Sequence, residues 1–319
     1  MIRGFLVSEN TSKLKLGRPL GPGEILDRAL AVLASRWKSI LVLVAAAVLP
    51  GALLHYYVSS EWVLANFPRN SFDFQGVLRV AGEREGIASP YASLSVGAYE
   101  VLTFIAAGAC AAIVAQAFVG QRRSVSDGLR SLSERWMTAG PAVILAAVAV
   151  YSLDRTFASI LGRLYPMVIS GTMNPLLFIV LSRYLSPLVF TPIYHLVRLV
   201  GISIVSASVL EACSLGGSIW LGLSSILHKQ RLLVAVLFSL AFTFLYFIFD
   251  QLAIGAPLVL LVTRSPIADT LYDVLDRVVP LSIVIVSAIV FYLDSRLRQG
   301  VNVPEDFVAR LELESIAEV

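Results

Sequence analysis

Titratable side chains stand inside several long apolar stretches of this chain, where an ionised group is costly. Glu100, His195 and Arg198 interrupt runs of small and branched apolar residues, and Asp250 lies near the end of a further run. A charge at the centre of a membrane helix costs roughly 2.5–3.5 kcal/mol on insertion scales. These four residues are therefore candidates for an intramembrane polar site that binds an ion, a proton or a lipid headgroup, or whose members pair with one another.

His195 and Arg198 are close enough in sequence to share one face of a helix that contains both. Pro187 and Pro192 interrupt the same segment. Helix breaks at these prolines could expose backbone carbonyls to a cavity, as in transporters, or be ordinary kinks. If the span starts near Pro187, both side chains lie close to the membrane midplane. If it ends near Val200, Arg198 is instead a residue of the membrane interface.

Spacings typical of an enzyme are absent from the sequence. The histidines, His55, His195 and His228, are widely separated, and Cys110 and Cys213 lie in or beside apolar runs. The sequence contains no Walker loop, nucleophile elbow, HExxH or CxxC pattern. We therefore expect no enzymatic activity, no cofactor and no metal site.

Apolar stretches long enough to cross a bilayer dominate the chain. Of its 319 residues 57% are hydrophobic and 15% charged, whereas soluble domains carry about a quarter charged residues. A helix needs roughly 20 residues to cross the hydrocarbon core, and backbone groups in lipid must bond within their own segment. The pattern predicts an all-α integral membrane bundle of about six transmembrane helices. The expected spans lie near residues 39–58, 94–119, 138–153, 187–210, 232–252 and 279–293.

The fourth of these spans is the least defined. From Pro175 to Leu210 the chain is almost continuously apolar. This segment could form one long kinked helix, or an outer-interface segment followed by a span.

Basic residues lie mainly on one side of the expected membrane. Sixteen Lys and Arg residues fall on the side that holds the N-terminus and seven on the other, while Arg183 and Arg198 lie in the ambiguous region. The positive-inside rule then puts both termini in the cytoplasm. The net charge of +3 is too small to indicate nucleic acid as a partner.

An apolar pattern recurs before the first, third and fifth spans. Its members are spaced by four, three and four residues, the period of an amphipathic helix. The first two copies end in the same dipeptide, Arg36–Trp37 and Arg135–Trp136, and Lys229 takes the place of the arginine in the third. The copies are Leu26, Leu30, Leu33 and Trp37; Val125, Leu129, Leu132 and Trp136; and Ile219, Leu223, Ile226 and Gln230.

The recurrence predicts three parallel units, each an interfacial helix followed by two spans. The interfacial helices are expected near residues 22–37, 124–136 and 215–229, with Pro22 in a first turn and a capping box of Ser124 with Asp127. Residues 1–300 would form one transmembrane domain, followed by a short cytoplasmic tail, 301–319. The alternative is that any helix leading into a span looks amphipathic. On the first interpretation Arg36, Trp37, Arg135 and Trp136 contact lipid or pack at the interface.

Short stretches near both ends of the chain resemble a bacterial membrane protein family. They are LGPGEILDRALAVLASRWKSILVLVAAAVLPGALL and the ending Phe291–Gly300, which contains a Tyr-x-Asp-x-Arg pattern. Glu211 also stands where that family tends to carry an acid. The family is known as the membrane domain of glycerophosphoryl diester phosphodiesterase, after fusions to a catalytic domain that this sequence lacks. The resemblance therefore implies a polytopic membrane protein and not phosphodiesterase activity.

The polar residues at the exit of the last span, Asp294 and Arg296, could contact the neighbouring interfacial helices or anionic lipid headgroups. The leading hypothesis is a non-enzymatic protein that organises membrane lipids or partner membrane proteins. The alternative is a transporter or lipid translocase, with Glu100, His195 and Arg198 along its path.

Overall fold

The computed structural model of the chain describes residues 18–53, 90–121, 124–169, 186–227, 229–253 and 265–317. These residues form helices and their connections, without a strand among them. The helices are α2 (Pro22–Ala52), α5 (Pro90–Phe118), α6 (Val125–Glu134), α7 (Trp136–Ile169), α9 (Ser186–Leu210), α10 (Leu215–Leu227), α11 (Lys229–Ala253), α13 (Pro266–Arg298) and α14 (Val303–Ala317).

Six of these helices, α2, α5, α7, α9, α11 and α13, are long and apolar enough to cross a membrane. The prediction of an all-α chain with six such helices is confirmed, and their number and hydropathy are typical of a multi-pass membrane protein. The start of the first and the end of the sixth lie together, because the Leu20 N–H donates to the Asp294 carboxylate over 2.6 Å.

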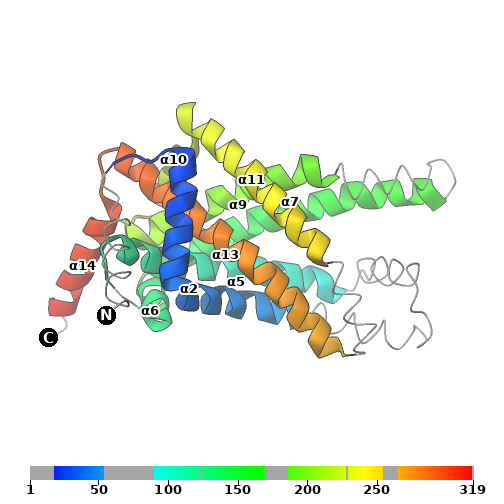
Figure 1. The fold of residues 1–319 in the computed structure, drawn as a ribbon, viewed down its shortest axis with the longest axis horizontal. Coiled ribbons are helices and arrows are strands. Elements are labelled where there is room, and N and C mark those ends of the chain that lie inside the picture. The colour runs from blue at the N-terminus through cyan, green and yellow to red at the C-terminus, as the bar shows by residue number, and fades with distance from the viewer. Residues whose placement is uncertain are drawn as a thin grey trace, which may run out of the picture.

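The apolar helices divide into a central and an outer group. In the most apolar stretches of α5, α9 and α13, 83%, 72% and 72% of the residues are buried, against 33%, 39% and 28% in α2, α7 and α11. Each outer helix packs between two central ones: α2 between α13 and α5, α7 between α5 and α9, and α11 between α9 and α13. Apart from the first part of α2, the axes of the long helices are roughly aligned, with the chain running back and forth along them (Figure 1).

Small residues allow the helices to approach closely. A side chain on Gly201 of α9 would place its Cβ 2.7 Å from the Phe104 ring of α5. At Gly222 of α10, a Cβ would lie 2.8 Å from the backbone nitrogen of Ile204 in α9. Contacts of this kind are typical of membrane helix packing, where small residues bring backbones together.

In two of the outer helices, the part that runs along the bundle follows a short helical segment and a sharp bend. In α2 the bend is at Arg36, whose φ of −124° and ψ of 17° are not helical. Arg135, between α6 and α7, has nearly the same conformation, with φ −108° and ψ 16°. Figure 1 shows the first part of α2 crossing the bundle and the second part running along it.

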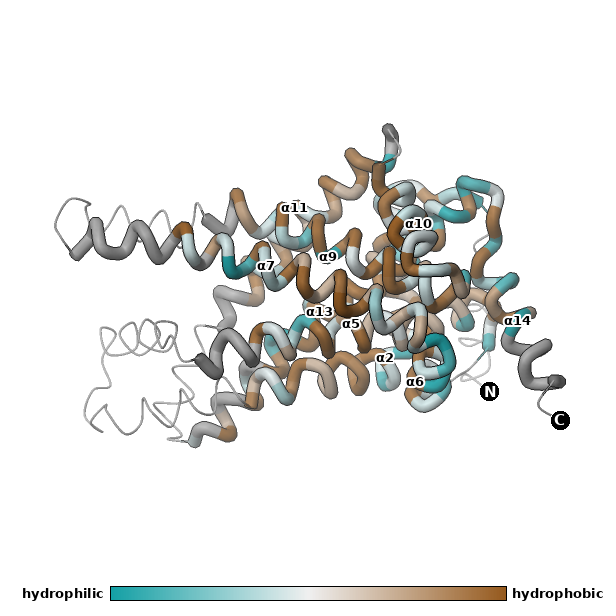
Figure 2. The backbone as a smooth tube through the Cα atoms, turned by 180° about the vertical axis from the view of Figure 1, so that it is seen from behind, coloured by the Kyte–Doolittle hydropathy of each residue, from teal (hydrophilic) through white to brown (hydrophobic). Residues whose placement is uncertain are grey.

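The first part of α2 (residues 22–35), α6, α10 and α14 gather at one end of the bundle, which we call the basal end (Figure 1). Figure 2 shows hydrophilic residues concentrated there, notably on α6, while α5, α9 and α13 are hydrophobic along much of their length. Pro22 begins α2 as expected. The backbone N–H of Ser124 donates to the Asp127 carboxylate over 2.8 Å, as the predicted capping box requires.

Several helices extend beyond the expected spans. The third span was expected over residues 138–153, yet α7 is a helix of 34 residues. α13 begins at Pro266, well before residue 279. Hydropathy marks the part of a helix that suits lipid, and a helix can continue beyond it into water. Asp154 and Arg155, for example, form a half-exposed pair 2.7 Å apart within α7.

Within the described residues, the fourth apolar helix runs from Ser186 through Pro192 to Leu210. It does not end near Val200. Residues 175–185, which would show where the span starts, lie outside the described residues, as do 54–58 at the expected end of the first span. The tail contains α14, which packs against α5 and α9 with Phe307 fully buried.

Candidate functional site

A buried ion pair joins two of the central helices. Arg198 of α9 donates from Nη2 to both carboxylate oxygens of Glu100 in α5, over 2.6 and 2.7 Å. Each side chain is only 2% exposed. The hydroxyl of Tyr194, one turn before Arg198, donates to Glu100 Oε1 over 2.7 Å. The carboxylate and the guanidinium neutralise one another inside the bundle.

This ion pair lies within the apolar part of its helices. At about 1.5 Å per residue, Arg198 is about 18 Å from the basal end of α9, and Glu100 about 27 Å from the basal end of α5. Both lengths are shorter than the roughly 30 Å thickness of a hydrocarbon core, so the pair lies within the apolar length of two helices that could cross one.

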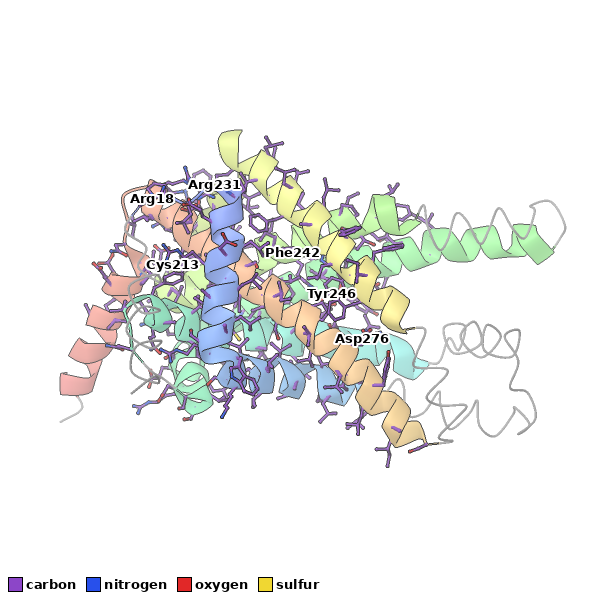
Figure 3. All side chains as sticks on the ribbon, in the orientation of Figure 1. Arg18, Cys213, Arg231, Phe242, Tyr246 and Asp276 are labelled. Atoms are coloured by element: carbon purple, nitrogen blue, oxygen red, sulfur yellow. The ribbon has the colours of Figure 1, made fainter. Side chains whose placement is uncertain are left out.

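His195 lies beside the ion pair but faces a different helix. Its side chain is 1% exposed, and its ring centroid lies 4.8 Å from that of Tyr246 and 6.2 Å from that of Phe242, both in α11. In the view of Figure 3 these two aromatic residues of α11 lie between it and the neighbouring α13. Within the described part of the chain, neither ring nitrogen of His195 has a hydrogen-bond partner. Buried polar atoms without partners are uncommon and call for an explanation.

The predicted intramembrane site is thus partly assembled. The structure pairs Glu100 with Arg198 and places His195 next to them, whereas the side chain of Asp250, in α11, lies outside what the structure describes. Tyr194 was missed, although its spacing of four from Arg198 is a signal in the sequence. Tyr246 could not have been found, because its position depends on how α11 packs against α9.

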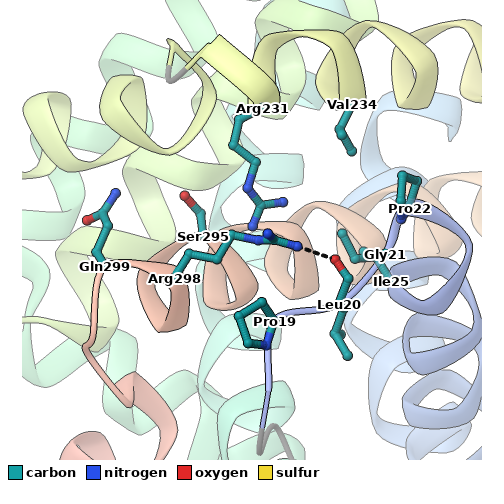
Figure 4. A pocket seen from close by; sticks show the side chains of 10 residues that line it. All are labelled: Pro19, Leu20, Gly21, Pro22, Ile25, Arg231, Val234, Ser295, Arg298 and Gln299. Atoms are coloured by element: carbon teal, nitrogen blue, oxygen red, sulfur yellow. Dashed lines mark hydrogen bonds between the residues drawn. The ribbon is translucent and has the colours of Figure 1, made fainter.

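A second buried carboxylate, that of Asp294 in α13, organises the basal end. It is fully buried and accepts hydrogen bonds from the Leu20 N–H, from Arg231 at the start of α11 and from Arg298. Arg298 also donates to the Leu20 carbonyl (Figure 4). Asp294 therefore ties the end of the last apolar helix to the starts of the first and the fifth.

Glu211, directly after α9, forms a separate network with the end of α13. Arg296 donates to its two carboxylate oxygens over 2.8 and 2.7 Å, and the Tyr292 hydroxyl donates to it as well. Residues four apart share a helix face, so Tyr292 and Arg296 both reach Glu211, while Asp294 between them faces the other way. The Tyr-x-Asp-x-Arg pattern thus serves two networks.

Arginines at the starts of the outer helices reach the ends of central helices. Arg36 donates to the Gln121 carbonyl over 2.7 Å, after α5, and Arg135 to the Val209 carbonyl over 2.5 Å, in α9. Arg231 makes the corresponding contact with Asp294 in α13. Of the predicted interfacial residues, the arginines therefore bond to the bundle, whereas Trp37 and Trp136 are 52% and 44% exposed.

A cavity of about 450 Å³ opens at the basal end, between the start of α2, the start of α11 and the end of α13. Arg231, Arg298 and Ser295 supply part of its polar lining, and Ile25 and Val234 part of its apolar lining (Figure 4). No local sequence pattern predicts this cavity, because its walls come from three segments, of which the first lies more than 200 residues before the other two.

Within the described residues, no group of His, Cys, Asp and Glu side chains is placed to hold a metal ion. Comparison with known protein families, with characterised proteins and with solved structures finds no match for this chain.

Proposed function

We propose that this chain is a non-enzymatic protein of the bacterial inner membrane that organises membrane lipids around its basal end. Both termini lie in the cytoplasm in this proposal. The observation that carries it is the set of exposed tryptophans at the basal end. Trp37, Trp136 and Trp220 are 52%, 44% and 71% exposed, and each belongs to or borders one of the basal helical segments, the first part of α2, α6 and α10. Tryptophan favours the headgroup layer, where one side of its ring system is wet and the other apolar.

The proposal includes three parallel units, each a basal segment, an outer helix and a central helix. The units are α2 with α5, α6 and α7 with α9, and α10 and α11 with α13. Two observations support this proposal. Each outer helix packs between the central helix of its own unit and the central helix of the unit before it, with the third unit standing before the first. An arginine at the start of each outer helix also bonds to the end of the central helix in the same unit. Membership of the resembled bacterial family stays a prediction.

The experiment compares lipid retained by the intact protein and by variants, using native mass spectrometry after gentle extraction. A triple variant, Trp37→Ala, Trp136→Ala and Trp220→Ala, should retain fewer lipids than the wild type. Phe244→Ala is the matched control, because Phe244 is an aromatic residue of α11 that is 65% exposed on the side of a span. Equal lipid retention by the wild type and the triple variant would contradict the proposal, and a stoichiometric second protein would point to the organisation of partners instead.

A transporter or lipid translocase is the second candidate, and His195 is the observation that favours it. This buried side chain has unpartnered nitrogens next to an ion pair in the apolar part of the bundle. Such an arrangement suits a path for a proton or a polar group. Substrate flux into proteoliposomes that His195→Phe abolishes, in a folded protein, would support this candidate.

A further inference from the structure

The cavity at the basal end has the features of an anion site. We propose that it binds a phosphate-bearing anion, held by Arg231 and Arg298 beside the first turn of α2. The phosphate could belong to an anionic phospholipid or to a soluble ion, and the experiment below separates these sources. The case in which the phosphate belongs to a phospholipid rests on the proposed function, whereas the cavity is an independent observation.

The charges that line the cavity leave a positive surplus. Two guanidinium groups, those of Arg231 and Arg298, face a single buried carboxylate, Asp294. Both oxygens of that carboxylate are already occupied, Oδ1 by the Leu20 N–H and Oδ2 by the two arginines. The nearby carboxylate of Glu24 is neutralised by Arg18, which lies 2.5 Å away. An anion that enters the cavity therefore meets one uncompensated positive charge.

Arg231 also has hydrogen-bonding capacity that the protein does not use. Its side chain is 6% exposed and lines the cavity, and its buried Nε has no partner among the described residues. A guanidinium carries five N–H donors in a planar fork that matches the oxygens of a phosphate. A phosphate in the cavity would accept hydrogen bonds from the guanidinium N–H groups that reach it, and such charge-assisted bonds are strong.

The first turn of α2 adds a partial positive charge to the same cavity. Gly21 and Pro22, at its start, both line the cavity. Glycine has no side chain that could accept hydrogen bonds from the first-turn amides. Pro22 has no N–H and the Gly21 N–H is bonded to Glu24, so the first turn contributes through the helix dipole, whose positive end favours anions. Glu24 opposes this attraction only in part, because it accepts from the Gly21 N–H and is paired with Arg18.

The apolar side of the cavity favours a lipid over free phosphate. Leu20, Ile25 and Val234 line it beside the arginines, at the end of the bundle where the exposed tryptophans lie. A volume of about 450 Å³ lies in the usual range for small-molecule sites. The cavity is therefore large enough for a phosphate with its glycerol, and its apolar wall suits the start of the acyl chains.

The test uses the full chain in nanodiscs of phosphatidylcholine with a small fraction of phosphatidylglycerol, and native mass spectrometry counts the bound anionic lipid. Arg298→Gln removes one cavity charge and should weaken binding about fivefold, the effect of one basic residue near a membrane surface. Arg298→Lys keeps the charge and should largely restore binding. Val234→Trp fills the cavity without changing any charge and should abolish binding.

Arg130→Gln is the matched control, because it removes a basic residue of the basal end that pairs with Glu134 on α6 and does not line the cavity. It should bind as the wild type does. Thermal unfolding of each variant checks that the compared proteins are folded.

The outcomes separate this inference from the proposed function. If the wild type retains phosphatidylglycerol and both Arg298→Gln and Val234→Trp retain it equally, the cavity is not the site, although lipid organisation stands. If inorganic phosphate displaces from the wild type the lipid that Val234→Trp fails to retain, the cavity binds the phosphate group itself. If no lipid is retained, the proposed function fails, and a titration with inorganic phosphate then tests the anion site. Saturable phosphate binding that is lost in Arg298→Gln supports the site. No phosphate binding overturns it.

Discussion

Glu100 and Asp294 are both buried carboxylates that pair with an arginine from another helix, yet their surroundings differ. Glu100 meets one guanidinium, that of Arg198, and a tyrosine hydroxyl, in the apolar part of the bundle. Asp294 meets two guanidinium groups at the basal end, beside a cavity of about 450 Å³. The first group of charges is balanced, and the second carries a surplus that faces an open space.

This comparison separates two uses of the same chemistry. A balanced ion pair in an apolar environment offers little to a ligand, and it specifies how α5 and α9 pack because each charge needs the other. A surplus charge beside a cavity remains available to an anion. We therefore assign helix packing to Glu100 and Arg198, and ligand binding to the cavity beside Asp294.

The largest expected effect comes from breaking the balanced pair. Glu100→Leu or Arg198→Met alone should lower the free energy of unfolding by about 3–5 kcal/mol, because one buried charge loses its partner. The double variant should recover most of that loss, since both charges are gone. Unfolding measured in lipid or detergent would show this. Additive losses in the double variant would contradict a packing role.

The Asp294 network should respond differently to the loss of its carboxylate. Asp294→Asn should destabilise the protein by about 3 kcal/mol, because Arg231 is buried and loses its ionic partner. The same change raises the positive charge at the cavity, so phosphatidylglycerol should bind about fivefold more tightly. Native mass spectrometry and thermal unfolding of one sample would report both. Weaker lipid binding in a folded Asp294→Asn protein would argue against the anion site.

His195 tests whether the balanced region also carries a function. His195→Phe should change the free energy of unfolding by less than about 1 kcal/mol, because an apolar ring replaces nitrogens that have no partner among the described residues. The ring would pack between Phe242 and Tyr246. A large loss of stability would indicate a polar partner of His195. Loss of substrate flux at unchanged stability would move the function into this region.

The smallest expected effect is that of ionic strength, which should change lipid binding at the basal end but not the contribution of the buried ion pair to stability. Raising the ionic strength from about 0.05 to about 0.5 M should weaken phosphatidylglycerol binding at the basal end, where charges are partly exposed to water. The stability difference between the wild type and the Glu100→Leu/Arg198→Met variant should stay constant, because buried pairs are poorly screened. Lipid binding that does not depend on salt would indicate that apolar contacts dominate at the cavity.

The sequence predicted those features that depend on local patterns. Apolar stretches gave the six helices, the Ser124–Asp127 spacing gave a helix start, and charges in apolar runs singled out Glu100 and Arg198. Each of these signals lies within one segment of the chain and needs no knowledge of the tertiary fold.

The missing features depend on contacts between distant segments. In the sequence, Arg231 is only one of the basic residues counted on the side of the N-terminus. The packing of α11 against α13 brings it to Asp294. The helical period separates Asp294 from Tyr292 and Arg296, but it does not indicate which partner each of them meets. The cavity has walls from three helices, so no local pattern could indicate it.

The most direct test of the contrast is one native mass spectrometry experiment on three proteins in the same mixed-lipid nanodiscs. They are the wild type, the Glu100→Leu/Arg198→Met double variant and Arg298→Gln. Our account predicts that the double variant retains phosphatidylglycerol as the wild type does, while Arg298→Gln loses most of it. Loss of the lipid in the double variant, with full retention in Arg298→Gln, would contradict the account and place the binding site in the intramembrane region.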